Sequence, residues 1–275
     1  MQLISKTMMH TIDWNAAWRQ ARTHRKHDRG GKQHWNKRAP SFAQHARKSS
    51  YPADFIRLMT PRPEWSVLDV GCGAGTLAIP LAGLVRRVTA IDLSDTMIAL
   101  LRAQCEEQGI ANVRADVLGW EDDWEQAGIG EHDAAIASRS LAVDDLRLAL
   151  TKLHDKARKR VYLASLVGDG PFDRRIFEAI GRDLDRGPDY IYVYNLLYQM
   201  GIHADVSFVM NGDGGRVYRD LDDAMDKFDW MIDGITPEET TSLRRYFEQH
   251  LRRTTGGWVL SHRHVVRWAI ISWSK

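Results

Sequence analysis

Residues 67–76, Val-Leu-Asp-Val-Gly-Cys-Gly-Ala-Gly-Thr, constrain the fold of this chain more than any other stretch. The apolar residues before Gly71 predict a buried strand, which three alternate glycines then break. Helical character begins at Leu77. A glycine turn between a strand and a helix can adopt positive φ angles, and it lets a ligand approach the free N–H groups of the helix. The stretch therefore predicts an α/β sheet with a nucleotide site at this turn.

A second acidic residue stands at the distance that such a site needs. Residues 88–92 are another short apolar segment, which ends in Asp92, 17 residues after Gly75. A carboxylate at the tip of the second strand can accept hydrogen bonds from both hydroxyls of a ribose. We therefore expect Asp92 to bind the sugar of the ligand.

The glycine spacing does not match a dinucleotide fingerprint, because Thr76 stands where G-x-G-x-x-G requires its third glycine. Asp69, ahead of the glycines, would oppose a pyrophosphate but suits a ligand with an ammonium group. Over residues 67–167, the pattern resembles class I S-adenosylmethionine-dependent methyltransferases. The resemblance implies S-adenosylmethionine as cofactor and S-adenosylhomocysteine as product. The alternative is a glycine turn that only packs a helix on a strand.

The same resemblance implies an α/β fold with a seven-stranded, doubly wound, mostly parallel sheet whose last strand is antiparallel. Beyond the first two strands, we expect strands within residues 112–117, 132–140, 160–167, 204–208 and 264–272. We assign residues 1–60 to a helical N-terminal cap and residues 61–275 to the methyltransferase domain, with a helical lid insertion at 212–260. The insertion is acidic and the cap basic, so we expect them to meet over the active site; independent, solvated segments are the alternative.

The resemblance also assigns cofactor contacts to the ends of the first four strands. These residues are Asp69, Gly71, Cys72, Gly73, Gly75, Asp92, Leu93, Asp116, Val117 and Ser138. Asp116 would accept the exocyclic amine of adenine, and the N–H of Val117 would bind a ring nitrogen. Trp120 is positioned in the sequence to cover the adenine. A loop-capping role is the alternative for Asp116.

Arg139 follows the fourth strand directly. Ligands of open α/β sheets bind beyond the carboxyl ends of the strands, at the switch in strand order. We therefore expect Ser138, Arg139 and Ser140 to lie where the acceptor and the methyl group meet. The fork of Arg139 matches a carboxylate or a phosphate, although pairing with an internal acid is equally consistent with the sequence. The exit of this strand has no Asn/Asp-Pro-Pro-Tyr/Phe motif, which argues against adenine-N6 methylation.

The remaining candidate residues lie in the cap and in a tyrosine-rich segment. As substrate-binding residues we propose Trp35, Arg38, Tyr51, Arg139, Tyr194 and Tyr198, of which Arg139 and the three tyrosines are also catalytic candidates. Core packing is the alternative role for the aromatic ones. In-line methyl transfer needs a general base only if the acceptor must lose a proton. His34 and His203 are further candidate bases, and the sequence does not choose among them.

Composition limits the partners of the chain. The net charge is +2, but residues 19–48 contain ten Lys/Arg and one acid. This segment can be a solvated helix face, a flap for an anionic substrate or an RNA contact. We expect a small, anionic acceptor; an RNA or protein methyltransferase and a non-catalytic cofactor-binding protein are the alternatives. The two cysteines and the absence of a long apolar run predict a cytoplasmic protein without a membrane span. No residue cluster has metal-ligand spacing, and the oligomeric state stays open.

Overall fold

A computed structural model describes residues 11–23, 31–46, 50–211, 217–229, 231–232 and 234–275. The chain divides into two compact units. The sheet unit comprises Met1–Leu166, Gly187–Val209 and Trp268–Lys275. The insertion unit comprises Val167–Arg186 and Met210–Arg267.

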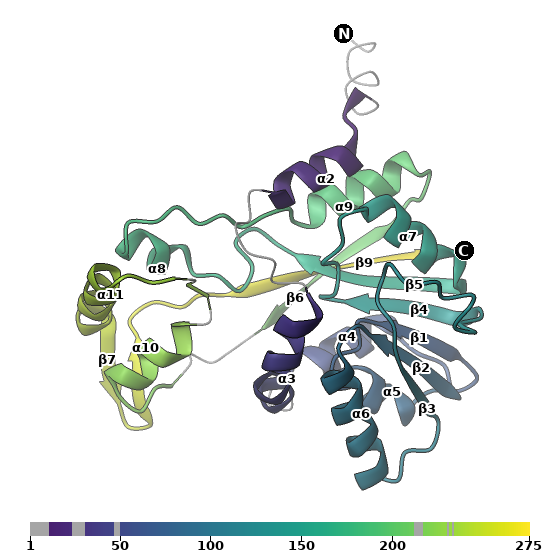
Figure 1. The fold of residues 1–275 in the computed structure, drawn as a ribbon, viewed down its shortest axis with the longest axis horizontal. Helices are drawn as coiled ribbons and strands as arrows, with labels where there is room; N and C mark the ends of the chain where they lie inside the picture. Colours follow the sequence, from purple (N-terminus) through teal and green to yellow (C-terminus); the bar gives the residue numbers. More distant parts are fainter. Residues whose placement is uncertain (1–10, 24–30, 47–49, 212–216, 230, 233) are drawn as a thin grey trace. The chain divides into compact units, whose positions relative to one another are not determined.

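The sheet unit is built on one seven-stranded sheet with the order β3-β2-β1-β4-β5-β9-β6 (Figure 1). Its strands are β1 (Ser66–Val70), β2 (Arg87–Asp92), β3 (Val113–Val117), β4 (His132–Ser138), β5 (Ala157–Leu166), β6 (Asp205–Asn211) and β9 (Val266–Ser274). Strands β1 to β5 pair in parallel, and β9 runs antiparallel to β5. The expected sheet and its antiparallel last strand are therefore confirmed. The strand order switches at β1, which lies between β2 and β4, so the carboxyl ends of these strands border the ligand crevice of such sheets.

Helices cover both faces of this sheet (Figure 1). Helices α5 (Ala78–Ala82) and α6 (Asp95–Glu107) pack on β2 and β3, and α7 (Leu146–Asp155) packs on β4 and β5. Two of the helices begin at side-chain caps, because Ser94 Oγ accepts the N–H of Met97 and Asp145 Oδ1 accepts the N–H of Leu148. Such caps satisfy N–H groups that the first helical turn leaves unpaired.

The described helices of the N-terminal region belong to the sheet unit. They are α2 (Trp14–Thr23), α3 (Lys32–Ala46) and α4 (Tyr51–Met59). Helix α2 packs against α9 (Tyr190–Gln199), and α3 packs against α6. Residues 24–30 and 47–49, which hold part of the basic run, lie outside the described residues.

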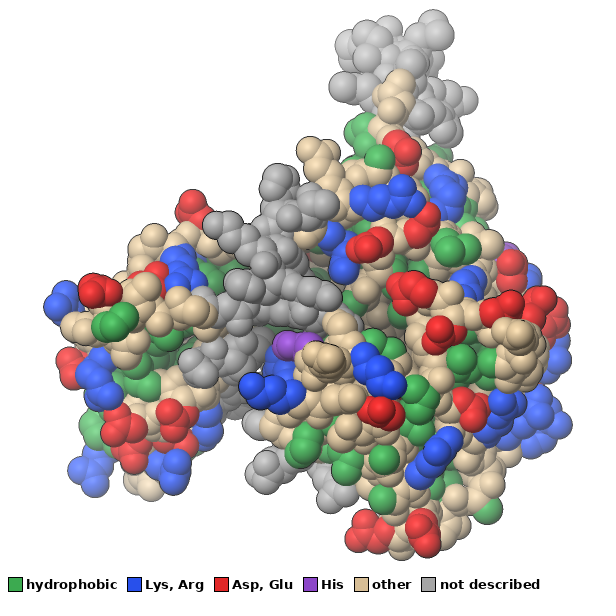
Figure 2. Space-filling model, in the orientation of Figure 1, with side chains coloured by type: hydrophobic (Ala, Val, Ile, Leu, Met, Phe, Trp, Pro, Cys, Tyr) green, Lys and Arg blue, Asp and Glu red, His purple; other side chains and the backbone are tan. Residues whose placement is uncertain are grey.

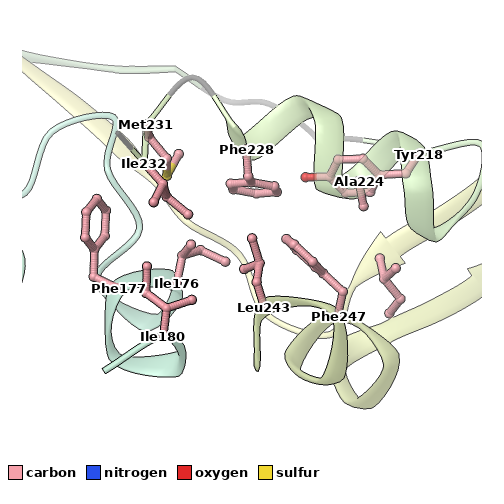
Figure 3. Close-up of a cluster of buried hydrophobic side chains, with 11 residues drawn as sticks. Ile176, Phe177, Ile180, Tyr218, Ala224, Phe228, Met231, Ile232, Leu243 and Phe247 are labelled. Carbon is pink, nitrogen blue, oxygen red and sulfur yellow. The ribbon is translucent and has the colours of Figure 1, made fainter. Parts of the chain in front are cut away.

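The insertion unit has its own apolar core (Figure 3). It contains α8 (Arg174–Ala179), α10 (Leu221–Asp229), α11 (Pro237–His250) and the hairpin β7 (Leu251–Thr254) and β8 (Gly257–Leu260). Phe228 of α10 and Phe247 of α11 pack with ring centroids 5.1 Å apart. A capping box begins α11, since Thr236 and Glu239 exchange side-chain and backbone hydrogen bonds. Residues 167–186 join this unit, so it extends beyond the expected insertion 212–260, whose role as a lid stays a prediction.

Surface charge is mixed. In Figure 2 the Lys/Arg and Asp/Glu side chains of the described residues are interspersed over the visible face. This pattern agrees with the small net charge of +2. None of the described helices is long and apolar enough to cross a membrane.

Candidate active site

The glycine turn adopts the backbone conformations that its sequence predicts. Gly71, Gly73 and Gly75 have φ angles of 70°, 56° and 91°. The N–H groups of Gly71 and Cys72 donate to the carbonyl of Ile91, at 2.7 and 3.1 Å, and so tie the end of β1 to β2. A Cβ added to Gly71 would lie 2.2 Å from Cβ of Ser140. Only glycine therefore fits at the point where β1 meets the exit of β4.

Asp92 holds this loop in place. Its Oδ2 accepts the N–H of Gly73 and its Oδ1 accepts the N–H of Ser94, both at 2.9 Å. The carboxylate is 7% exposed, and burial raises its pKa although these hydrogen bonds act in the opposite direction. Each carboxylate oxygen has two lone pairs, so both oxygens keep capacity for the ribose hydroxyls that we assign to Asp92.

Asp69 is a buried carboxylate with an unused oxygen. It is 1% exposed, and among the described residues its Oδ2 has no hydrogen-bond partner. Burial, and then the charge of Asp92, raise the pKa of Asp69 to about 7. An unsatisfied buried acceptor is costly, and a cationic ligand would relieve that cost. The residue therefore has the charge and the free acceptor that an ammonium group needs, and its role as a cofactor contact stays a prediction.

The expected adenine end is less enclosed. Asp116 forms an ion pair with Arg114, with Nε and Oδ2 2.6 Å apart, and Val117 is 41% exposed. Leu93 is partly buried. Trp120 is 8% exposed, and its indole donates to the carbonyl of Ser140 at 2.9 Å. That hydrogen bond ties Trp120 to the β4 exit, so its assigned place over an adenine stays a prediction.

Comparison with known proteins decides the family. Residues 67–159 match the family model described as "Methyltransferase domain". The chain belongs to the class I S-adenosylmethionine-dependent methyltransferases. The matched residues contain the glycine turn, Asp92 and the exit of β4. The chain is therefore a methyltransferase enzyme whose cofactor is S-adenosylmethionine, which carries an ammonium, a ribose and a sulfonium-bound methyl group.

The chain is also similar to individual proteins. An uncharacterised protein of Haemophilus influenzae is 33% identical over 245 residues, which cover 87% of this chain and 88% of that protein. A ubiquinone biosynthesis O-methyltransferase of Methylocella silvestris is 42% identical over 72 residues, or 26% of this chain and 27% of that protein. The structure of a putative methyltransferase from Bacillus halodurans superposes with a TM-score of 0.52 at 15% identity, covering 82% of this chain and 99% of that one.

Directly after β4, Arg139 lies in a corner between two aromatic rings. Its guanidinium carbon is 4.2 Å from the ring centroid of Tyr51 and 5.4 Å from that of Trp268. Arg139 has a φ of 59°, which is strained for a residue with a side chain and is typical of functional sites. Burial lowers its pKa. No ion pair joins Arg139 to an acid among the described residues. The alternative that Arg139 pairs with an internal acid is therefore not observed in this part of the chain.

Tyr51 and Ser138, both predicted site residues, are in contact. The Tyr51 hydroxyl and Ser138 Oγ are 2.7 Å apart, and Tyr51 is 0% exposed. Burial raises the pKa of Tyr51 to about 12, although Arg139 and the hydrogen bond with Ser138 act in the opposite direction. The structure therefore brings Tyr51, Ser138 and Arg139 together at the carboxyl end of β4.

Helix α3 lies against the glycine turn. Trp35 and Phe42 pack edge to face, and both pack on a buried cluster that contains Ala74 of the turn. Asn36 Oδ1 accepts from Ser94 Oγ at 2.6 Å, which fixes α3 on the start of α6. Core packing accounts for the contacts of Trp35, so its assigned role in binding substrate, like that of Arg38, stays a prediction.

Tyr194 and Tyr198 occupy the helix that supports α2. Helix α9 packs on α2, where Trp14 and Tyr192 make an edge contact with centroids 5.7 Å apart. Tyr198 is 45% exposed, and its ring lies 5.8 Å from that of His203. The catalytic and substrate-binding roles assigned to Tyr194 and Tyr198 stay predictions.

Two residues at the site were not predicted. Trp268 contacts Arg139 because the β5–β9 pairing brings it opposite Leu166. Phe42 lies over the turn, since a Cβ on Gly73 would be 3.4 Å from its ring. No local pattern marks either residue, because both contacts join segments that are distant in sequence.

Proposed function

We propose that this methyltransferase acts on a small acceptor with an anionic group, which Arg139 holds beyond the carboxyl ends of β1 and β4. The observation that carries the proposal is the position of Arg139 in a strained, partly buried corner, with aromatic rings rather than an acid as its described neighbours. A guanidinium kept from water in this way gains most from a ligand that brings the opposite charge. When bound, S-adenosylmethionine supplies the activated methyl group.

The chain contributes binding, orientation and exclusion of water in this proposal. Asp69 would hold the ammonium of the cofactor, Asp92 its ribose, and Arg139 the acceptor. The leaving group of a sulfonium is already activated, so holding the acceptor in line supplies much of the rate acceleration. Cys72 and Cys105 are free and buried, which supports the proposed cytoplasmic location.

The experiment compares three pools of acceptor. The purified protein is incubated with S-adenosylmethionine labelled in its methyl group and with the small-molecule, RNA or protein fraction of a bacterial extract. We expect label in the small-molecule fraction. Label in RNA or protein would favour those substrates instead, and cofactor binding without transfer to any pool would favour a non-catalytic protein. The Asp92→Ala variant, which should bind the cofactor poorly, is the negative control.

A further inference from the structure

The corner around Arg139 contains two polar groups whose N–H donors lack a hydrogen-bond acceptor among the described residues. Among the residues the structure describes, neither the Arg139 guanidinium nor Nε1 of Trp268 has a hydrogen-bond acceptor, and the latter atom is buried in a side chain 8% exposed. A buried donor without an acceptor destabilises the protein. The buried Nε1 of Trp268 on β9 and the partly buried guanidinium at the exit of β4 together suit a ligand with more than one acceptor oxygen.

The charges near the corner favour a ligand with a single negative charge. One negative charge would balance Arg139. The second charge of a dianion would not be balanced by Arg139. A carboxylate therefore fits better than a phosphate dianion.

The corner offers a poor general base. Tyr51 is the titratable group in contact with Arg139, and its hydroxyl is bound to Ser138. Because the pKa of Tyr51 is raised to about 12, its hydroxyl stays protonated near neutral pH and cannot take up a proton from the acceptor. An acceptor atom that already carries negative charge needs no base. The nucleophile is therefore best supplied in its ionised form.

We infer that the methylated group is itself a carboxylate, held by Arg139 and Trp268, and that the product is a methyl ester. One carboxylate oxygen bonds to the methyl carbon while the carbon–sulfur bond breaks and its electron pair leaves on sulfur. No proton is released, so no base is required. The planar fork of a guanidinium matches a carboxylate, and burial of the carboxylate away from water strengthens its attack. This inference rests on the proposed function.

The first test uses the alkali lability of methyl esters. Products labelled from methyl-tritiated S-adenosylmethionine and the small-molecule fraction of a bacterial extract are treated with alkali, and volatile methanol is counted. We expect most of the label to become volatile. Arg139→Gln should lose at least about tenfold in ester formation while keeping its affinity for S-adenosylhomocysteine. Arg57→Gln, an exposed change on the helix that carries Tyr51, is the matched control.

The outcomes distinguish a failure of the ester inference from a failure of the proposed function. Label that stays non-volatile would overturn the ester and leave methyl transfer to a small molecule standing. Absence of transferred label would count against both. Equal ester formation by Arg139→Gln and the unchanged chain would overturn the assignment of the carboxylate to this corner.

The second test measures binding without cofactor. Calorimetry compares benzoate, neutral benzamide and phenyl phosphate as probes of the cofactor-free protein. We expect benzoate to bind at least about tenfold more tightly than either of the others, and Arg139→Gln to remove the preference. A preference for phenyl phosphate, or no binding of benzoate, would overturn the inference. Arg139→Lys keeps the charge but not the fork, and should retain only part of the preference.

Discussion

The carboxylate of Asp92 accepts the backbone N–H of Gly73 at 2.9 Å, so the acid expected to bind the ribose also shapes the glycine turn. A second hydrogen bond, from the N–H of Ser94, fixes the other oxygen. The start of α6 and the cofactor loop are thus both tied to one side chain. This arrangement orients Asp92 before any ligand binds, which lowers the entropic cost of binding.

We predict that Asp92→Ala weakens the binding of S-adenosylhomocysteine by about 1–3 kcal/mol, because hydrogen bonds to a charged acceptor are lost. Isothermal titration calorimetry measures the change. Asp95→Ala, which removes an exposed acid three positions further along, should leave the affinity unchanged. An Asp92→Ala affinity equal to that of the unchanged chain would refute the ribose assignment.

The pKa of Asp69 predicts a pH dependence of stability. Its folded-state value of about 7 lies above its ordinary 3.8, so the folded state binds the proton more tightly. Folding stability should therefore fall as pH rises from about 4 to about 7 and level off above that range. Urea unfolding of the ligand-free protein at several pH values measures this trend. In Asp69→Asn, the free energy of unfolding should change less over the same pH interval.

Cofactor binding should depend on pH in the opposite direction. An ammonium group pairs with the ionised form of Asp69, so affinity for S-adenosylhomocysteine should rise as pH increases through about 7. Calorimetry between pH 6 and 8, compared with Asp69→Asn, tests this. If both proteins showed the same pH profile, Asp69 would not hold the ammonium.

Gly71→Ala should destabilise the protein more than Gly128→Ala. Both glycines have positive φ, 70° and 72°, so both substitutions introduce backbone strain. A Cβ at 71 would also lie 2.2 Å from Cβ of Ser140, whereas nothing lies within 4 Å at 128. We expect an additional loss of about 1–3 kcal/mol for Gly71→Ala in urea unfolding. Equal losses would mean that Ser140 moves aside freely.

Trp18 anchors the segment that follows Arg139. Its indole donates to the carbonyl of Val143 at 2.7 Å and is buried. Trp18→Phe should cost about 0.5–1.5 kcal/mol in the free energy of unfolding, because this hydrogen bond is lost. Trp14→Phe, on the same helix, is the matched control, since Nε1 of Trp14 has no hydrogen-bond partner among the described residues. Similar losses in the two variants would show that the hydrogen bond contributes little.

The sequence by itself determined the parts of the site that neighbouring residues encode. The glycine spacing predicts the positive φ angles, and short apolar segments predict the strands that carry Asp69 and Asp92. These features depend on backbone sterics and short-range hydrogen bonds, so a local pattern suffices.

Only the tertiary structure decided which distant residues meet. Trp268 contacts Arg139 because β9 inserts beside β5 in one particular register, and Phe42 covers Gly73 because α3 docks on α6. The grouping of residues 167–186 with the insertion is likewise set by shared apolar burial. Such contacts depend on long-range packing, which many sequences satisfy in different ways, and local patterns do not encode it.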